Sequence, residues 1–362
     1  MSVSFEINSS IKSYQVDIVR MQLEASLYDP KQYFVLVDEL VLELYPYLQA
    51  DRLIVIPAVE ESKSLETVGY VVEQLRLLGA NRNSHLIAVG GGIIQDIATF
   101  VASIFMRGIR WTYYPTTLLG MVDSCVGGKS SINVGQFKNI AGNFYPPERI
   151  LIDTHFCGTL QHQELISGLC EAVKICFAEK GAQFDQYLKL ADKNGLVDEA
   201  DLPKVIELSL MTKKKFIEED EFDTGLRLLL NFGHTFGHAI EAAGNFSITH
   251  GVAVGLGMQI ANHLSEQIYP SSTSVKRVKA LDDYLSVLLK GVPALSKALS
   301  KISPELFLEK FKSDKKHTAD EYVVIFPDVD GYLYRHFVDK NKEFESLLLA
   351  SFEHLKGCYE VQ

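Results

Sequence analysis

A run of three glycines between an apolar strand and a helix constrains the fold of this chain more than any other feature. Gly90, Gly91 and Gly92 follow the apolar residues 85–89 and precede a helical pattern over residues 93–105. Glycines at such a turn let backbone N–H groups approach a phosphate, and the helix N-terminus carries about half a positive charge. The run is not GxGxxG, so by itself it fits a tight turn that binds nothing equally well.

Strands and helices alternate on both sides of this turn. Short β-branched runs predict strands at residues 33–37, 53–56, 85–89 and 111–114, and apolar residues at helical spacing predict a helix over 64–79. This alternation predicts a parallel, doubly wound α/β sheet, in which ligands bind beyond the carboxyl ends of the strands.

The pattern becomes mainly helical after about residue 157. Helices are predicted at 163–179, 202–217, 251–267 and 275–289, and a hairpin joins strands at 322–326 and 332–337. A length of 362 residues fits two domains. We therefore expect a nucleotide-binding α/β domain over residues 1–157 and a mainly α-helical domain over residues 158–362.

Composition limits the partners and the compartment. The net charge of −11 disfavours nucleic acid and anionic membranes, because both require a basic surface. Five scattered cysteines provide no disulfide framework, which favours a reducing, cytoplasmic setting. The first 20 residues lack a signal-peptide core, and no apolar stretch reaches the roughly 20 residues needed to span a bilayer.

Histidines beside glycines indicate a metal site. His234 and His238 lie four residues apart on one helix face, His250 follows twelve residues later, and Glu171 lies on an earlier predicted helix. Three His/Glu ligands with an open fourth position suit a catalytic zinc. A lone histidine is more often a hydrogen-bonded structural residue, and His238 could bind an anion instead.

Cationic residues lie inside apolar or glycine-rich segments. In a chain of negative net charge, such a set suits a small phosphorylated and carboxylated ligand held by charge-assisted hydrogen bonds. Lys214 and Lys215 fit a solvated surface better. The candidate ligand-binding cations are Arg107, Lys129, Lys138, Lys213, Arg227 and the pair Lys315–Lys316.

Many of these residues fall into one ordered set of motifs. The set comprises Gly90–Gly92 with Asp96, Arg107-Gly108, Thr116-Thr117, Asp123, Gly127-Gly128-Lys129, Lys138-Asn139, Glu171 with Lys174, Arg227, the segment from Asn231 to Ala239, and His250-Gly251. In order and spacing it resembles the 3-dehydroquinate synthase family of the sugar phosphate cyclases. The resemblance extends clearly over residues 60–316.

The resemblance implies roles for individual residues. Zinc, or cobalt in its place, would be held by Glu171, His234 and His250. NAD would contact Asp38, Glu60, Lys63, Gly90, Gly91, Gly92, Asp96, Thr116, Thr117, Lys138, Thr159, Leu160 and Gln163. The substrate would be surrounded by Asp123, Lys129, Lys138, Asn139, Lys174, Lys213, Arg227, Asn231, His238 and one of Lys315 or Lys316. Arg107 would reach the substrate phosphate, either within its own subunit or across the interface of a homodimer.

The same resemblance implies a reaction and a setting. A cytoplasmic lyase of the shikimate pathway, and so of aromatic amino acid biosynthesis, would convert 3-deoxy-D-arabino-heptulosonate 7-phosphate to 3-dehydroquinate and phosphate. NAD would oxidise a secondary alcohol transiently, phosphate would leave by β-elimination, the hydride would return, and an aldol step would close the ring.

Three residues depart from the family pattern. Phe137 stands where a glycine usually precedes Lys-Asn, Val252 where glutamate commonly follows His-Gly, and Leu40 where a polar residue often contacts the cofactor. Because of these departures, a second interpretation stays open, in which the chain is a cyclase for another sugar phosphate, such as sedoheptulose 7-phosphate or glucose 6-phosphate. A metal-dependent polyol dehydrogenase and a non-enzymatic binding protein are the rivals from other classes.

Overall fold

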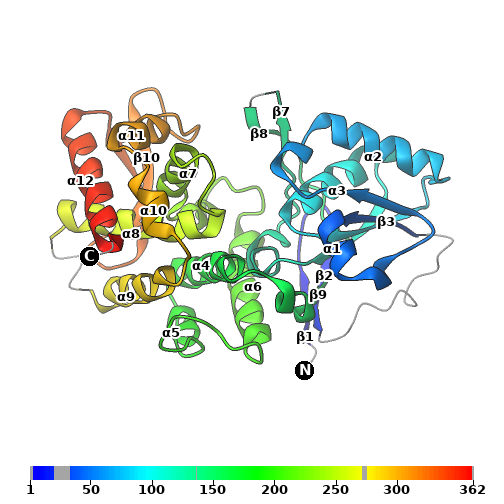
Figure 1. Ribbon diagram of the computed structural model, residues 1–362, viewed down its shortest axis with the longest axis horizontal. Coiled ribbons are helices and arrows are strands. Elements are labelled where there is room, and N and C mark those ends of the chain that lie inside the picture. The colour runs from blue at the N-terminus through cyan, green and yellow to red at the C-terminus, as the bar shows by residue number, and fades with distance from the viewer. Residues whose placement is uncertain (1–2, 20–32, 136, 271–274, 361–362) are drawn as a thin grey trace. The chain divides into compact units, whose positions relative to one another are not determined.

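The computed structural model describes residues 3–19, 33–135, 137–270 and 275–360, which form two compact units (Figure 1). The first unit comprises Met1–Leu160 and Leu202–Glu221, and the second comprises Gln161–Asp201 and Phe222–Gln362. These units differ from the division predicted at residue 157, because the first unit continues to Leu160 and also includes helix α6 (Leu202–Glu219). Helix α6 packs there against β1 and η5, which are far from it in sequence, so local patterns could not assign it.

A seven-stranded sheet forms the core of the described part of the first unit. Its strand order is β1-β2-β9-β6-β5-β3-β4, and all neighbours run parallel except the antiparallel pair β1–β2 at one edge. The strands are β1 (Val3–Ile7), β2 (Tyr14–Val19), β3 (Tyr33–Asp38), β4 (Leu53–Ile56), β5 (His85–Gly90), β6 (Arg110–Pro115) and β9 (Arg149–Asp153). The four predicted strands are confirmed, and β1, β2 and β9 are additions.

Helices connect these strands. Helix α2 turns Val68, Val71 and Leu75 inward, as its predicted periodicity requires, and α3 follows directly from β5. The helical segments are α1 (Glu39–Leu44), η2 (Pro46–Leu48), η3 (Glu60–Ser62), α2 (Leu65–Leu77), α3 (Gly92–Ile104), η4 (Phe105–Arg107), η5 (Gly120–Ser124) and η6 (Thr154–Thr159). A small hairpin, β7 (Ile132–Val134) with β8 (Phe137–Ala141), stands apart from the main sheet (Figure 1).

The second unit is mainly helical, as predicted. Its elements are α4 (His162–Ala178), α5 (Gln183–Leu188), η7 (Leu226–Asn231), α7 (His234–Ala243), α8 (His250–Ile268), α9 (Lys276–Lys290), α10 (Leu295–Ser300), α11 (Pro304–Lys312), α12 (Lys342–Tyr359) and the hairpin β10 (Glu321–Pro327) with β11 (Leu333–Asp339). Helix α8 is the central helix and packs against α4, α7, α9 and α12. The predicted fold class is confirmed.

Two glycines allow α8 to approach its neighbours closely. A Cβ on Gly251 would lie 2.0 Å from the carbonyl oxygen of Ser167 on α4, and a Cβ on Gly257 would lie 2.1 Å from the carbonyl oxygen of Gly233. Only glycine fits at such contacts. The first turn of α8 is thereby held against α4, and the N-terminus of α7 is held against the middle of α8.

Within the described ranges, no helix combines the length and apolarity that crossing a bilayer demands.

Candidate functional site: a metal centre and a nucleotide turn

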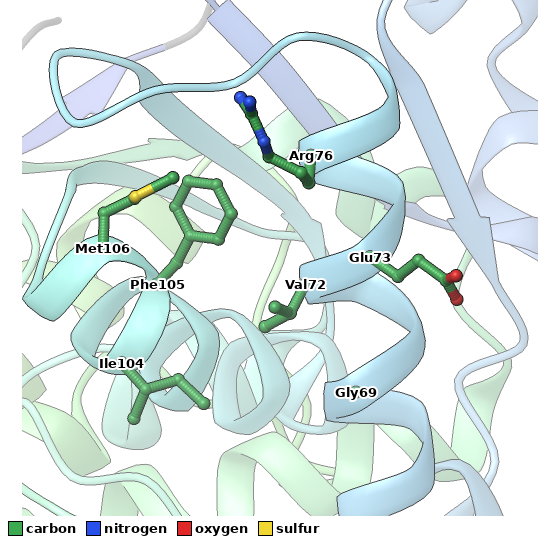
Figure 2. Close-up of a pocket in the computed structure, with 7 residues that line it drawn as sticks. All are labelled: Gly69, Val72, Glu73, Arg76, Ile104, Phe105 and Met106. Carbon is green, nitrogen blue, oxygen red and sulfur yellow. The ribbon is translucent and has the colours of Figure 1, made fainter.

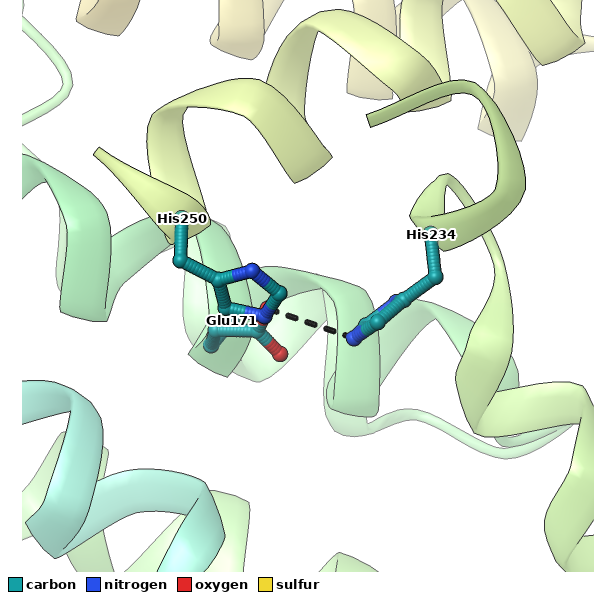
Figure 3. Close-up of side chains that lie close together, drawn as sticks. All are labelled: Glu171, His234 and His250. Carbon is teal, nitrogen blue, oxygen red and sulfur yellow. Dashed lines mark ion pairs between the residues drawn. The ribbon is translucent and has the colours of Figure 1, made fainter. Parts of the chain in front are cut away.

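Three side chains from three helices of the second unit converge on one point (Figure 3). His234 is the first residue of α7, His250 is the first residue of α8, and Glu171 lies within α4. Glu171 Oε1 lies 3.8 Å from His234 Nε2 and 3.6 Å from His250 Nε2. One ligand atom from each residue falls within 4.8 Å of the others. Two imidazole nitrogens and one carboxylate are a donor set that suits a divalent metal of the zinc type.

The far nitrogen of each imidazole has a hydrogen-bond acceptor. His234 Nδ1 lies 3.3 Å from the carbonyl oxygen of Phe232, and His250 Nδ1 lies 3.1 Å from Glu241 Oε2. A carbonyl or carboxylate oxygen can only accept, so Nδ1 carries the proton in both rings. The lone pairs of the neutral imidazoles then lie on the Nε2 atoms that face Glu171, as metal ligation requires.

Buried charges surround this cluster. Lys174 Nζ donates to Glu171 Oε2, and both side chains are almost fully buried. Burial, with the positive charge of Lys174, holds the pKa of His234 well below its ordinary value. Burial acts in the same direction on His250, but the hydrogen bond and charge of Glu241 outweigh it and raise the pKa of His250. The two imidazoles therefore sit in different electrostatic surroundings.

His238 lies one turn after His234 on α7 and belongs to a neighbouring ion-pair group. Its Nδ1 is 3.8 Å from Asp314 Oδ2, which is 3.6 Å from Lys316 Nζ. Burial lowers the pKa of both His238 and Lys316. Of the two lysines left open by the sequence, Lys315 is exposed and Lys316 is the one directed toward Asp314 and His238.

The η7 segment carries two further predicted residues of this unit. Arg227 is buried, with 4% of its surface exposed, and Asn231 donates from Nδ2 to the Leu228 carbonyl oxygen. Val252, which replaces a glutamate of the family pattern, is fully buried. An unpaired charge at so buried a position would be costly, and the carboxylate beside His250 in this structure belongs to Glu241 of α7.

The glycine turn of the first unit has the predicted geometry. Strand β5 ends at Gly90, Gly91 is the N-cap of α3, and Gly92 begins the helix. A Cβ on Gly90 would lie 2.3 Å from Ile94 Cγ1, whereas a Cβ on Gly92 would meet nothing within 4 Å. Thr117 lies against the turn, since a Cβ on Gly91 would be 3.1 Å from its methyl group. The space beside Gly92 is therefore open at a helix N-terminus.

Polar residues predicted to contact NAD lie in several loops. Asp38 caps α1 and accepts hydrogen bonds from the amides of Leu40 and Ala58, and burial raises its pKa. Lys63 Nζ lies 2.8 Å from Asp96 Oδ2, and burial raises the pKa of Asp96 to about 6 against the opposing charge of that lysine. Leu40 is 58% exposed.

The other predicted NAD contacts fall into two places. The amide of Thr116 donates to the Gly90 carbonyl oxygen at the glycine turn. Thr159 Oγ1 pairs with the Tyr45 hydroxyl at 2.9 Å, and Leu160 ends η6. Gln163 lies on α4 of the second unit.

The β7–β8 hairpin is tied to the Glu60 segment. Asn133 Nδ2 donates to Glu60 Oε1, and Lys138 Nζ lies 3.8 Å from the same oxygen. Asn139 has a positive φ of 55° and donates its amide to Asn133 Oδ1. Phe137, which also departs from the family pattern, is 62% exposed.

Lys129 and Lys213 differ in their surroundings. Gly127 and Gly128 precede Lys129 with positive φ values, and a Cβ on Gly128 would lie 3.0 Å from Pro146, so Gly128 provides close backbone packing. Lys213 on α6 forms an ion pair with Asp123 Oδ1 and donates to the Asp123 carbonyl oxygen at 2.6 Å. The structure thus brings Asp123 and Lys213 together.

Arg107 lies at the end of η4 with a positive φ of 68° and is exposed. Beside it, a largely apolar pocket is formed by α2, the end of α3 and η4 (Figure 2). Val72 and Arg76 line one side and Ile104, Phe105 and Met106 the other. None of the predicted site residues lines this pocket.

Sequence reasoning missed Glu241. Its spacing carried a usable signal, because His234, His238 and Glu241 follow at i, i+4 and i+7 and therefore share one face of α7. Glu241, His238 and His250 also form a second group whose ligand atoms lie within 4.8 Å.

Fold and site together define a protein class. Its members combine a parallel α/β unit that has a glycine turn with a helical unit in which two histidines and a glutamate lie close enough to bind one metal ion. Residues 53–167 match the 3-dehydroquinate synthase N-terminal family, and residues 168–317 match the 3-dehydroquinate synthase C-terminal family. The chain belongs to the 3-dehydroquinate synthase family, a family of lyase-type cyclases, which confirms the resemblance seen in the sequence.

Individual relatives agree with this assignment. A 3-dehydroquinate synthase of Dictyoglomus thermophilum is 40% identical over 257 residues, which cover 70% of this chain and 72% of the relative. One from Campylobacter fetus subsp. fetus is 34% identical over 311 residues, or 84% of this chain and 86% of the relative.

Solved structures share the fold. A 2-deoxy-scyllo-inosose synthase complexed with carbaglucose-6-phosphate, NAD+ and Co2+ matches 97% of this chain and 100% of its own, with a TM-score of 0.83 and 23% identity. A 2-epi-5-epi-valiolone synthase from Streptomyces hygroscopicus with NAD+ and Zn2+ bound matches 96% and 98%, with a TM-score of 0.76 and 25% identity.

Proposed function

We propose that this chain is a 3-dehydroquinate synthase, which converts 3-deoxy-D-arabino-heptulosonate 7-phosphate to 3-dehydroquinate and phosphate. The observation that carries the proposal is the convergence of Glu171, His234 and His250 within 4.8 Å, beside the buried Lys174, in a chain of this family. The reaction places the enzyme in the shikimate pathway.

The metal site would be held by Glu171, His234 and His250. When bound there, a divalent metal supplies Lewis acidity for a substrate hydroxyl, and NAD supplies transient oxidation of the carbon that bears it. The two Nε2 lone pairs and the Glu171 carboxylate fit zinc, and cobalt takes the same ligands. Lys174 would remain beside the metal to hold a substrate hydroxyl group.

NAD would bind to the first unit at the glycine turn. The open space at Gly92 and the N-terminus of α3 suit a pyrophosphate. Asp38, Glu60 and the Lys63–Asp96 pair provide further polar contacts. The rest of the proposed NAD contacts are Gly90, Gly91, Thr116, Thr117, Lys138, Thr159, Leu160 and Gln163.

The substrate would be held by charge-assisted hydrogen bonds. We assign the phosphate to Lys129, Asn139, Asn231, His238 and Arg107, and the carboxylate to Lys213, Arg227 and a lysine of the Lys315–Lys316 pair, with Lys138 a further substrate contact. Lys316 is the better candidate, because it lies with Asp314 beside His238 whereas Lys315 is exposed. Asp123, paired with Lys213, would bind a substrate hydroxyl.

We also propose a cytoplasmic homodimer. All five cysteines are free, which suits a reducing compartment. The exposed apolar side chains of Ile104 and Met106 next to Arg107 support a subunit contact at η4. The molar mass in solution, measured by light scattering, tests the dimer, and a monomeric mass at micromolar concentration would contradict it.

A substrate panel tests the function. Purified protein with NAD and Zn2+ is incubated with 3-deoxy-D-arabino-heptulosonate 7-phosphate, sedoheptulose 7-phosphate, glucose 6-phosphate and glycerol, while phosphate and NADH are measured. We expect phosphate release with the first substrate and no net NADH, because the hydride returns within each turnover. Phosphate release with another sugar phosphate alone, or net NADH with glycerol, would replace the proposal by a different cyclase or by a polyol dehydrogenase.

Site variants test the residue assignments. His234→Ala and His250→Ala are expected to lose bound zinc and turnover, and a variant that keeps both would remove that residue from the ligand set. Lys129→Ala is expected to weaken binding of a phosphonate substrate analogue by about 2 kcal/mol, the order lost with a charge-assisted hydrogen bond. Unchanged affinity would exclude Lys129 from the phosphate site.

A further inference from the structure

His250 is shared by two groups of potential metal ligands. Its Nε2 faces Glu171 and His234, and its Nδ1 faces Glu241, which together with His238 forms the second group. A neutral imidazole has a single lone pair, because one of its two nitrogens carries the proton. As long as the imidazole of His250 keeps one proton, only one of its two nitrogens can bind a metal ion.

Glu241 determines which side that is. Its side chain is 13% exposed, and its Oε2 lies 3.1 Å from His250 Nδ1. An ionised carboxylate accepts hydrogen bonds and cannot donate, so it keeps the proton on Nδ1 and leaves the lone pair on Nε2. The other imidazole, His234, is oriented by a backbone carbonyl, so Glu241 is the one side chain of the described residues that performs this task for either histidine.

Helix α7 also explains why Glu241 can reach His250. The helix begins with His234 and carries Glu241 two turns later, while α8 lies against α7 and begins with His250. One helix thus supplies both a proposed ligand and the partner of the next ligand. A displacement of α7 would disturb both imidazoles together.

We propose that Glu241 is a positioning residue for the metal centre: it fixes the tautomer and ring orientation of His250, directs Nε2 toward Glu171 and His234, and is not itself a metal ligand. This inference rests on the metal site proposed above. Substituting partners of this kind typically lowers metal affinity by about 10–100-fold. An amide at this position could present its NH2 group to Nδ1 and move the proton to Nε2, which would remove the ligand lone pair.

The experiment measures Zn2+ affinity by competition with a chelating dye. Glu241→Gln is expected to bind Zn2+ about 10–100-fold more weakly than the wild type, and Glu241→Asp is expected to recover part of the loss. Glu309→Gln, at a side chain 68% exposed on α11, is the matched control and should bind like the wild type. The visible spectrum of the Co2+-substituted protein should change in Glu241→Gln, since the ligand geometry changes, and thermal unfolding of the metal-free variants checks that they are folded.

His238→Asn separates the positioning role from direct ligation. If Glu241 positions His250, this variant keeps Zn2+ affinity within about threefold, because His238 is outside the proposed ligand set. If the metal instead occupies the His238–Glu241–His250 group, His238→Asn and Glu241→Gln lose Zn2+ alike and Glu171→Gln does not, which overturns the proposal. Equal Zn2+ affinity of Glu241→Gln and the wild type would also overturn it, whereas a wild type that binds no metal would refute the metal site itself.

Discussion

Removal of the charge of Lys174 tests whether Glu171 belongs to a metal centre. The side chains of this pair are 2% and 1% exposed, and breaking one partner of a buried pair costs about 3–5 kcal/mol of unfolding free energy. In the metal-free protein, the imidazoles that face the Glu171 carboxylate at 3.8 and 3.6 Å can take up a proton on Nε2 and replace part of the lost charge. We therefore expect the lower figure, about 3 kcal/mol, for Lys174→Met in the metal-free protein.

The same substitution should cost less when metal is bound. A divalent cation at Glu171 supplies the missing positive charge, so we expect a loss of about 1 kcal/mol or less in the Zn2+-saturated protein. The difference of about 2 kcal/mol equals, by thermodynamic linkage, the gain in metal affinity of the variant. Lys174→Met should accordingly bind Zn2+ about 30-fold more tightly than the wild type, although it loses activity.

Urea unfolding at pH 8, followed by circular dichroism, measures both quantities, once with a chelator and once with saturating Zn2+. The double variant Glu171→Gln/Lys174→Met is the control. It removes both charges, so its metal-free stability should lie within about 1 kcal/mol of the wild type. Equal destabilisation of Lys174→Met with and without Zn2+, or a metal-free loss below about 1 kcal/mol, would refute the coupling between Lys174 and a metal at Glu171.

Two further predictions concern the glycine turn and a buried carboxyl group. Gly90→Ala should lower the free energy of unfolding by about 1–3 kcal/mol, because the new Cβ meets Ile94. Gly92→Ala has open space around its Cβ, so it should leave stability intact and weaken NAD binding in a calorimetric titration. Unchanged NAD affinity of Gly92→Ala would show that the pyrophosphate does not bind at this turn. Burial raises the pKa of Asp282 from 3.8 to about 7, so the folded state holds the extra proton between these values and stability falls as pH rises through this window. Asp282→Asn should remove that fall, which has an upper limit of about 4 kcal/mol. Asp283→Asn, at an exposed position, should keep most of it, because burial and not the charge of Asp283 is the largest cause of the raised pKa. Identical pH profiles of urea unfolding for all three proteins would contradict the assignment.

Much of the fold could be predicted because short sequence patterns indicate many of its helices and strands. The strands β3 to β6, the helices α2, α3, α4, α8 and α9 and the C-terminal hairpin match their predicted ranges closely. Each has a period, a β-branched run or a turn signal within its own residues. Strands β2 and β9 escaped prediction, and they pair over a distance in sequence that periodicity does not encode, for example Gln15 with Arg149. Strand β1, which pairs with the next strand in sequence, β2, was missed as well.

The candidate site divides in the same way. The amino-acid sequence determined which kinds of site could be predicted: a metal site from the histidines and glycines around His234, and a nucleotide site from the glycine turn at Gly90. Residue chemistry and local spacing are properties of the chain itself. Tertiary structure alone decided which groups meet: Glu171 with two imidazoles from other helices, Lys213 with Asp123, and Glu241 with His250. These contacts depend on how closely the helices pack. Helix packing is set in turn by contacts between residues far apart in sequence, such as Gly251 and Ser167, which are separated by 84 positions.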